Sequence, residues 1–373
     1  MRYQVHTQNG MINRGNWNKI KNCMRRAKRG EAVMTAFLGG SITQGSLSSA
    51  PETCYAYLVY SWWKEKFPEA DISFLNAGIG GTSSQFGVSR VNDHVLKYKP
   101  DFVLVEFAVN DENTEFFQET YEGLIRKICK DECNPAVLLM NNVQYDDGKN
   151  AEEMHLTVAK AYDLPMVSMK STIWPEVEAG NIVRSEITPD NLHPNDAGHE
   201  LVARVITDFL EQIYNEMDED EPVPFAKGFP APITANAYEE SVRYQNYNSN
   251  PETVGFTADP EPQNDIREIF RCGWTAGRAG DRICFQIEAT GIAVQYRKSV
   301  RKPAPIAKVV VDDREDQAVI LDANFQEDWG DCLYIDTITR HMEAGTHKVE
   351  ISIVEAHADD AVPFYLVSVI GSN

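Results

Sequence analysis

The sequence predicts two domains, an α/β domain built on a five-stranded parallel sheet and an antiparallel β-sandwich that follows it. Three observations lead to this prediction. Apolar segments alternate with helical ones up to residue 216, an acidic stretch with prolines comes next, and short segments rich in valine, isoleucine and aromatic residues fill the rest. The 373 residues match the length of two ordinary domains, and a hydrophobic content of 43% can give each domain a core.

Five apolar segments of the first part have the character of strands. They are 33–38, 71–75, 101–109, 136–140 and 165–169. The third is almost continuously apolar, which is typical of a strand buried on both faces. Helical segments separate the five, so we predict a parallel sheet with right-handed crossovers. A basic helix at 16–29 precedes them, and we interpret its lysines and arginines as a solvated face.

The second part contains almost no helix signal. We interpret 217–224 as an acidic linker, which gives domain boundaries of 1–216 and 225–373. Short strand segments then follow at close spacing, with turn residues between them. The clearest are 282–288, 291–297, 308–312, 318–321, 333–338, 347–354 and 364–370. This pattern predicts an antiparallel sandwich of jelly-roll type.

Composition narrows the range of partners. A net charge of −21 argues against nucleic acid and against an anionic membrane, because both need a basic protein surface. An uncharged sugar chain meets no such penalty.

No apolar stretch is long enough to cross a bilayer, and the first ten residues lack a signal-peptide pattern. Seven scattered cysteines show no metal-ligand spacing, so we expect mostly buried thiols, no metal, and a cytoplasmic protein.

Four short motifs stand where ligands bind in open α/β sheets, beyond the carboxyl ends of the predicted strands. Each motif alone is common in proteins, and their order is the informative feature. Along the chain they are Gly39-Gly40-Ser41, then 76–82 with its adjacent Gly80 and Gly81, then Asn110-Asp111, and finally Asp190-Asn191-Leu192-His193-Pro194.

This order resembles the SGNH (GDSL-like) hydrolase superfamily over about residues 32–212. The resemblance implies a flavodoxin-like three-layer α/β/α domain. The family's four namesake positions correspond to Ser41, Gly81, Asn110 and His193, and Asp190 lies three residues before the histidine. Gly80 is the alternative for the glycine. Gly40 stands where the family's GDSL motif has aspartate.

The resemblance also implies a mechanism without any cofactor or metal. Ser41 would be the nucleophile, His193 its general base, and Asp190 the group that orients the imidazole. The backbone N–H groups of Ser41 and Gly81 and the side-chain amide of Asn110 would form the oxyanion hole. The product of the first step would be an acyl-enzyme.

The second domain resembles the carbohydrate-binding modules joined to polysaccharide deacetylases, mainly over 345–353 and 364–371. We therefore expect a carbohydrate esterase that removes O-acetyl groups from a plant polysaccharide or its oligosaccharides. Resemblance to gut-bacterial mannan deacetylases favours β-mannan over xylan. We also expect the sandwich to fold back over the sheet's carboxyl edge and wall the site. Candidate sugar contacts are Trp329, Trp274, Trp174, Tyr145 and Asp146.

Several alternatives remain open. Trp274 and Trp329 can instead fill the sandwich core, and His199 can serve packing or face solvent at the start of its helix. A lipid or thioester hydrolase of the same family would need a long apolar trench. A carbohydrate-binding protein with a vestigial hydrolase domain is disfavoured because Ser41, Asn110, Asp190 and His193 are all present. A glycosidase pair of Glu106 and Asp111 is disfavoured because both flank one strand end. The sequence does not decide the oligomeric state.

Overall fold

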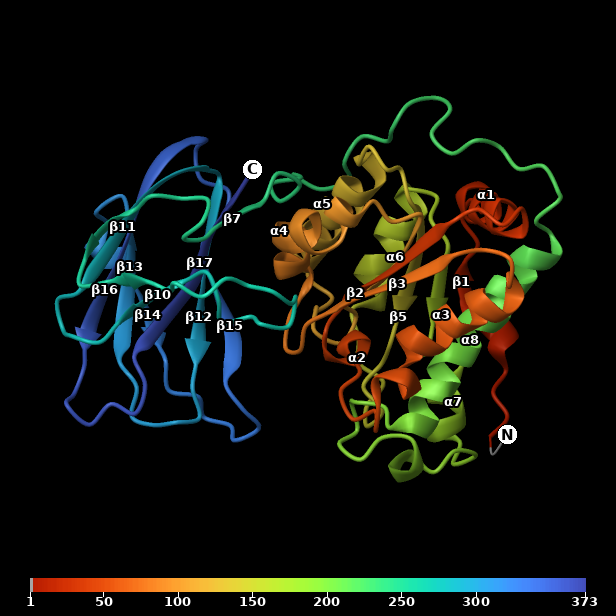
Figure 1. Ribbon diagram of the computed structural model, residues 1–373, viewed down its shortest axis with the longest axis horizontal. Helices are drawn as coiled ribbons and strands as arrows, with labels where there is room; N and C mark the ends of the chain where they lie inside the picture. Colours follow the sequence, from red (N-terminus) through yellow and green to blue (C-terminus); the bar gives the residue numbers. More distant parts are fainter. Residues whose placement is uncertain (1–2) are drawn as a thin grey trace. The chain divides into compact units, whose positions relative to one another are not determined.

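The computed structural model describes residues 3–373 and divides into two compact units, Met1–Asn236 and Ala237–Asn373 (Figure 1). The stretch 217–236 contains no helix or strand. Its later part, 225–236, belongs to the first unit rather than to the second. Glu122 anchors it there, because its carboxylate accepts hydrogen bonds from the backbone N–H groups of Ile233 (2.7 Å) and Thr234 (2.9 Å).

The described part of the first unit contains one six-stranded sheet with the order β1-β6-β5-β4-β2-β3. Strands β2 to β6 are parallel, in the order expected of a flavodoxin-like domain, so the predicted parallel sheet is confirmed. The bounds are β1 (Met11–Asn13), β2 (Val33–Gly39), β3 (Ile72–Gly78), β4 (Phe102–Glu106), β5 (Ala136–Asn141) and β6 (Met166–Ser168). The antiparallel edge strand β1 was not predicted, since three residues are too few to show a period.

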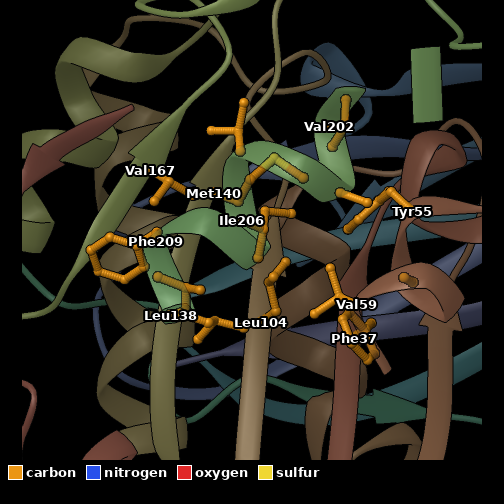
Figure 2. Close-up of a cluster of buried hydrophobic side chains, with 14 of the residues drawn as sticks. Phe37, Tyr55, Val59, Leu104, Leu138, Met140, Val167, Val202, Ile206 and Phe209 are labelled. Atoms are coloured by element: carbon orange, nitrogen blue, oxygen red, sulfur yellow. The ribbon is translucent and has the colours of Figure 1, made fainter. Parts of the chain in front are cut away.

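Helices cover both faces of this sheet. On one face lie α1 (Asn18–Lys28), α3 (Tyr55–Lys66) and α8 (Asp196–Asn215). Figure 2 shows their core: Val59 of α3 and Ile206 and Phe209 of α8 meet Leu104 and Leu138 of the sheet. Side by side on the other face lie α4 (Ser84–His94) and α5 (Glu115–Lys130), and α6 (Glu152–Ala161) contacts α5. The short helices are α2 (Ser41–Gln44) and α7 (Ile173–Glu178).

The helix that follows the D-x-x-H-P motif begins where side-chain chemistry predicts. The Asn195 side chain accepts a hydrogen bond from the N–H of Gly198 (3.1 Å), which satisfies one of the free donors of the first turn of α8. Strand β4 ends earlier than the apolar run suggests. The N–H groups of Asn110 and Asp111 both donate to the carbonyl of Phe107, at 3.0 and 2.9 Å. This tight turn ends the strand and places Asn110 at the carboxyl edge of the sheet.

The second unit consists of two antiparallel sheets, as predicted. One has the order β15-β12-β17-β10-β9, with β7 also paired to β17, and the other has the order β14-β13-β16-β11-β8. The bounds of the strands already expected are β11 (Arg282–Ala289), β12 (Gly291–Lys298), β13 (Ile306–Val311), β14 (Val319–Asp322), β15 (Cys332–Thr339), β16 (Gly345–Glu355) and β17 (Phe364–Ser372). Those not predicted are very short: β7 (Val242–Tyr244), β8 (Glu252–Val254), β9 (Thr257–Ala258) and β10 (Trp274–Ala276).

The core of the sandwich lies between its two sheets. Along β11 buried and more exposed residues alternate, so Ile283, Phe285 and Ile287 face inward. They pack against residues of the other sheet, among them Val294 and Leu366. Over residues 3–373, no helix is long and apolar enough to span a membrane.

Candidate active site

Ser41, His193 and Asp190 form a continuous hydrogen-bonded chain at the carboxyl edge of the first unit's sheet. His193 Nε2 lies 2.8 Å from Ser41 Oγ, and His193 Nδ1 lies 2.6 Å from Asp190 Oδ2. The structure therefore brings together the three side chains that the motifs selected, although Ser41 is 152 residues from His193 in sequence.

Ser41 is the first residue of α2 and follows β2 directly through Gly40. The turn is tight because α2 packs close against the ends of the strands. A Cβ atom at Gly40 would lie 2.5 Å from Asn110 Oδ1, and one at Gly78 would lie 2.1 Å from the backbone nitrogen of Gln44. Only glycine fits at either position without a shift of neighbouring atoms.

Hydrogen bonds within the loop that carries Asp190 and His193 fix its conformation. Asp190 Oδ1 accepts hydrogen bonds from the backbone N–H groups of Leu192 (3.0 Å) and His193 (2.7 Å), while Oδ2 faces the imidazole. Partial burial acts to raise the pKa of the Asp190 carboxyl, but these hydrogen bonds outweigh it and hold the pKa below its ordinary value. Asp190 therefore remains a carboxylate beside the imidazole.

This geometry is suited to proton transfer. A carboxylate at Nδ1 favours the tautomer in which Nδ1 carries the proton, so Nε2 is left to accept one from Ser41. The Ser41 residue is only 7% exposed, whereas the Asp190 and His193 side chains are 44% and 23% exposed. The serine is thus nearly enclosed by protein, while the imidazole retains contact with solvent.

The groups predicted for the oxyanion hole differ in the hydrogen-bond partners that they have in the structure. The backbone N–H of Ser41 opens α2, where helical N–H groups have no partner within the helix. The N–H of Gly80 already donates to Gln44 Oε1 at 2.6 Å, and Gly81 adopts a positive φ of 68°. Asn110 Oδ1 is buried against Gly40 and has no hydrogen-bond partner among the described residues.

Two buried side chains beneath the site, Arg90 and His155, were not selected from the sequence. Arg90 of α4 is fully buried, and its guanidinium donates to the carbonyl oxygens of Ala77 (2.8 Å) and Gly39 (3.0 Å), which ties the ends of β3 and β2 together. Asp111 and His155 form a second buried network, with 3.0 Å between Oδ2 and Nε2. A single arginine or histidine inside a helix has no sequence signature, so no pattern could have identified them.

The other polar candidates of this region are buried as well. Of the two alternatives for His199, the structure shows packing: its Nδ1 lies 3.3 Å from the Tyr55 nitrogen and its ring stacks on Tyr55, and burial lowers its pKa to about 4. Glu106 is fully buried, which raises its pKa to about 8. With Asp111 also enclosed, neither carboxylate of the glycosidase alternative reaches solvent.

The five candidate sugar contacts occupy different environments. Tyr145 is 1% exposed and donates to Asn142 Oδ1 (3.0 Å), and Trp274 is 3% exposed within the sandwich core. Both are packed on all sides, so neither has a free face on which a pyranose could stack. Trp174 is half-buried against Gly148, and Asp146 is exposed. Trp329 is 59% exposed, on a loop of the second unit.

The described residues contain no group of three or more His, Cys, Asp or Glu side chains placed to hold a metal ion. Of the seven cysteines, Cys133 and Cys284 are partly exposed and the remaining ones are buried. The expected burial of most thiols is therefore confirmed.

Comparison with known proteins places these features in context. Residues 37–201 match the model of the GDSL-like Lipase/Acylhydrolase family. A crystal structure of a two-domain esterase active on acetylated mannans, co-crystallised with mannopentaose, is 56% identical and has a TM-score of 0.95. That similarity covers 100% of this chain and 99% of the esterase.

Two curated relatives match about half of the chain. An acetylxylan esterase of Geobacillus stearothermophilus is 24% identical over 215 residues, covering 50% of this chain and 96% of the relative. Thioesterase 1/protease 1/lysophospholipase L1 of Escherichia coli (strain K12) is 26% identical over 185 residues, covering 48% of this chain and 83% of the relative.

Proposed function

Because the chain belongs to the GDSL-like SGNH hydrolase family and is an acetylesterase of that family, we propose that it removes O-acetyl groups from β-mannan or its oligosaccharides. The hydrogen-bonded chain from Ser41 through His193 to Asp190 is the observation that carries the esterase chemistry. The choice of mannan over xylan is supported by the 56% identity, over both domains, to an esterase active on acetylated mannans.

The proposed reaction has two steps, each with its own proton transfer. Ser41 Oγ attacks the acetyl carbonyl carbon while His193 Nε2 takes the serine proton. The bond to the sugar oxygen then breaks, and the imidazolium returns that proton to the departing hydroxyl. A water molecule then attacks the acetyl-serine while His193 Nε2 takes its proton; the bond to Ser41 Oγ breaks, Oγ takes that proton back, and acetate leaves. Asp190 stabilises the imidazolium in both steps.

The oxyanion of each tetrahedral intermediate needs donors that are already in place. We assign them to the backbone N–H groups of Ser41 and Gly81 and to the side-chain nitrogen of Asn110. Gly81 is favoured over Gly80 because the N–H of Gly80 is engaged by Gln44. The side-chain oxygen of Asn110 lies against Gly40. Its amide nitrogen, the donor of this side chain, is therefore the atom that we assign to the oxyanion hole.

The second unit is proposed to act as a carbohydrate-binding module. The exposed Trp329 is its candidate stacking residue. We further propose a cytoplasmic location, in which the substrates are oligosaccharides, since free and mostly buried thiols suit a reducing compartment.

Acetate release from acetylated mannan and acetylated xylan oligosaccharides tests the proposal, with Ser41→Ala as the comparison enzyme. The expected result is faster release from mannan, lost in the variant. A series of 4-nitrophenyl esters of increasing acyl length should show activity confined to short chains. Activity that rises with acyl length, or release from mannan that survives Ser41→Ala, contradicts the proposal.

A further inference from the structure

We propose that Asp111 and His155 are positioning residues of this esterase, whose buried pair holds the Gly81 loop and the Asn110 turn together so that both donors reach one oxyanion. This inference rests on the proposed function, because it takes the oxyanion role of Gly81 and Asn110 as given. Neither side chain is placed to contact the substrate: both are completely enclosed, with 0% of each side chain exposed.

A single carboxylate bridges two loops that are separate in sequence. Asp111 directly follows Asn110, in the turn that closes on the carbonyl of Phe107. Its Oδ1 accepts a hydrogen bond from the backbone N–H of Ser84 at 2.9 Å. Ser84 is the first residue of α4 and lies three positions after Gly81. The position of the Gly81 loop relative to Asn110 is therefore fixed through Asp111.

His155 holds the second oxygen of the same carboxylate. Its Nε2 lies 3.0 Å from Asp111 Oδ2, and its Nδ1 lies 3.1 Å from Asn141 Oδ1. The imidazole stacks on the Tyr121 ring, with 3.6 Å between centroids and 8° between planes. With both nitrogens bonded and one face covered, the ring can rotate only by breaking these contacts. Asp111 is thus held by a rigid partner.

Backbone contacts attach α6 to the same turn. The N–H of Ala151, just before α6, donates to the carbonyl of Ala108 at 2.8 Å, and the N–H of His155 donates to the carbonyl of Ala151 at 3.1 Å. On the other side, Ser84 Oγ and Thr120 Oγ1 share a hydrogen bond of 2.7 Å. The segment from Ala108 to Asp111 is consequently braced by α6, while the start of α4 is braced by α5.

The location of this pair distinguishes it from ordinary core packing. A buried charged or polar pair is often no more stabilising than apolar side chains of the same volume. Here the carboxylate belongs to the residue next to Asn110 and accepts a backbone hydrogen bond from Ser84, three residues after Gly81, while His155 holds its second oxygen. Small errors in donor position weaken transition-state stabilisation far more than they weaken substrate binding. The predicted signature is therefore a loss in kcat with little change in KM.

Two substitutions at His155 separate positioning from packing. His155→Phe keeps a ring on Tyr121 but cannot donate to Asp111, and we expect kcat for 4-nitrophenyl acetate to fall about tenfold with KM within about twofold. His155→Gln offers an amide donor to Asp111, and kcat should return to within about threefold of native. Tyr162→Phe is the matched control, because Tyr162 OH makes a similar buried hydrogen bond to Glu122 at 2.5 Å, apart from both loops. Its kcat should stay native.

A double-mutant comparison of kcat at Asp111 and Asn110 decides whether the two residues act together. Asp111→Asn should lower kcat in the native background, and lower it much less in an Asn110→Ala background, because the donor it positions is already gone. The inference is overturned if folded His155→Phe and Asp111→Asn keep kcat within twofold of native, or if the losses from Asp111→Asn and Asn110→Ala simply multiply. Should one variant not fold, the other still decides. Ser41→Ala, run in parallel, reports separately on the proposed function.

Discussion

The pair of Asp190 and His193 and the pair of Asp111 and His155 lie in the same unit, but their surroundings suit them to different roles. Asp190 and His193 are 2.6 Å apart with 44% and 23% of their side chains exposed, whereas Asp111 and His155 are 3.0 Å apart and fully enclosed. The other ring nitrogen of His193 faces the hydroxyl of Ser41, while that of His155 faces the amide oxygen of Asn141. A hydroxyl has a proton to transfer and an amide oxygen does not, so only the first pair is placed for catalysis.

The strongest test of this contrast is the same substitution at both histidines. His193→Gln should lower kcat by at least about 10⁴-fold, because the proposed base is removed, and His155→Gln should keep it within about threefold. Initial rates with 4-nitrophenyl acetate measure both. Thermal unfolding serves as the control, and His193→Gln should unfold at the native temperature. Residual activity above a tenth of native in His193→Gln would reverse the two roles.

Next in size is the loss of the donor that the buried pair is proposed to hold. Asn110→Ala should lower kcat by about 10²- to 10³-fold with little change in KM, since the amide acts on the oxyanion rather than on the bound ester. Asn181→Ala removes an exposed amide of the same unit and should leave the rates unchanged. A rise in KM with kcat preserved would instead make Asn110 a substrate-binding residue.

A smaller effect, on stability, is expected at His199, a third histidine that lies close to His193 in sequence but is buried. Burial lowers its pKa from 6.5 to about 4. Between these values the unfolded chain binds a proton that the folded chain excludes, so His199 weakens folding as the pH falls from 6.5 to 4. The loss should reach about 3 kcal/mol. Urea unfolding at pH 7 and pH 4.5 checks this.

The control for that experiment is His199→Gln, which cannot titrate. Its free energy of unfolding should fall less between the two pH values than that of the native protein. Equal slopes for the two proteins would show that other groups, and not His199, govern the acid limit.

The smallest effect is expected in the second unit. Trp329→Ala should raise KM for acetylated mannan oligosaccharides about threefold, through the loss of a stacking face, and leave 4-nitrophenyl acetate turnover unchanged. Trp174→Ala, in the first unit, offers a comparison at a half-buried tryptophan. If KM for the oligosaccharide does not change in Trp329→Ala, the sugar contacts of the second unit lie elsewhere.

The two pairs also mark the limit of prediction from sequence. Asp190 and His193 are three residues apart and join a motif order that spans the whole sheet, so the sequence alone is enough to select them as candidates. Asp111 and His155 are 44 residues apart, and their pairing depends on how α6 packs beside the turn after β4. In the same way, continuous apolar runs predicted the parallel strands, while the three-residue β1 and the short strands β7 to β10 carry no detectable period.

Aromatic residues in the loops were the weakest basis for prediction. Trp274 and Trp329 both stand beside glycines, yet one lies in the sandwich core and the other is 59% exposed. Tyr145 follows β5 in a loop but turns inward to Asn142. Whether such a ring is buried depends on tertiary packing that neighbouring residues do not encode.

The most direct test of the central claim, that Ser41 is a nucleophile activated by His193, is covalent labelling with diisopropyl fluorophosphate followed by peptide mass mapping. We predict one adduct, on Ser41, formed within about threefold of the native rate in His155→Gln and at a strongly reduced rate in His193→Gln. An adduct on another serine, or equal labelling of Ser41 in both variants, would contradict it.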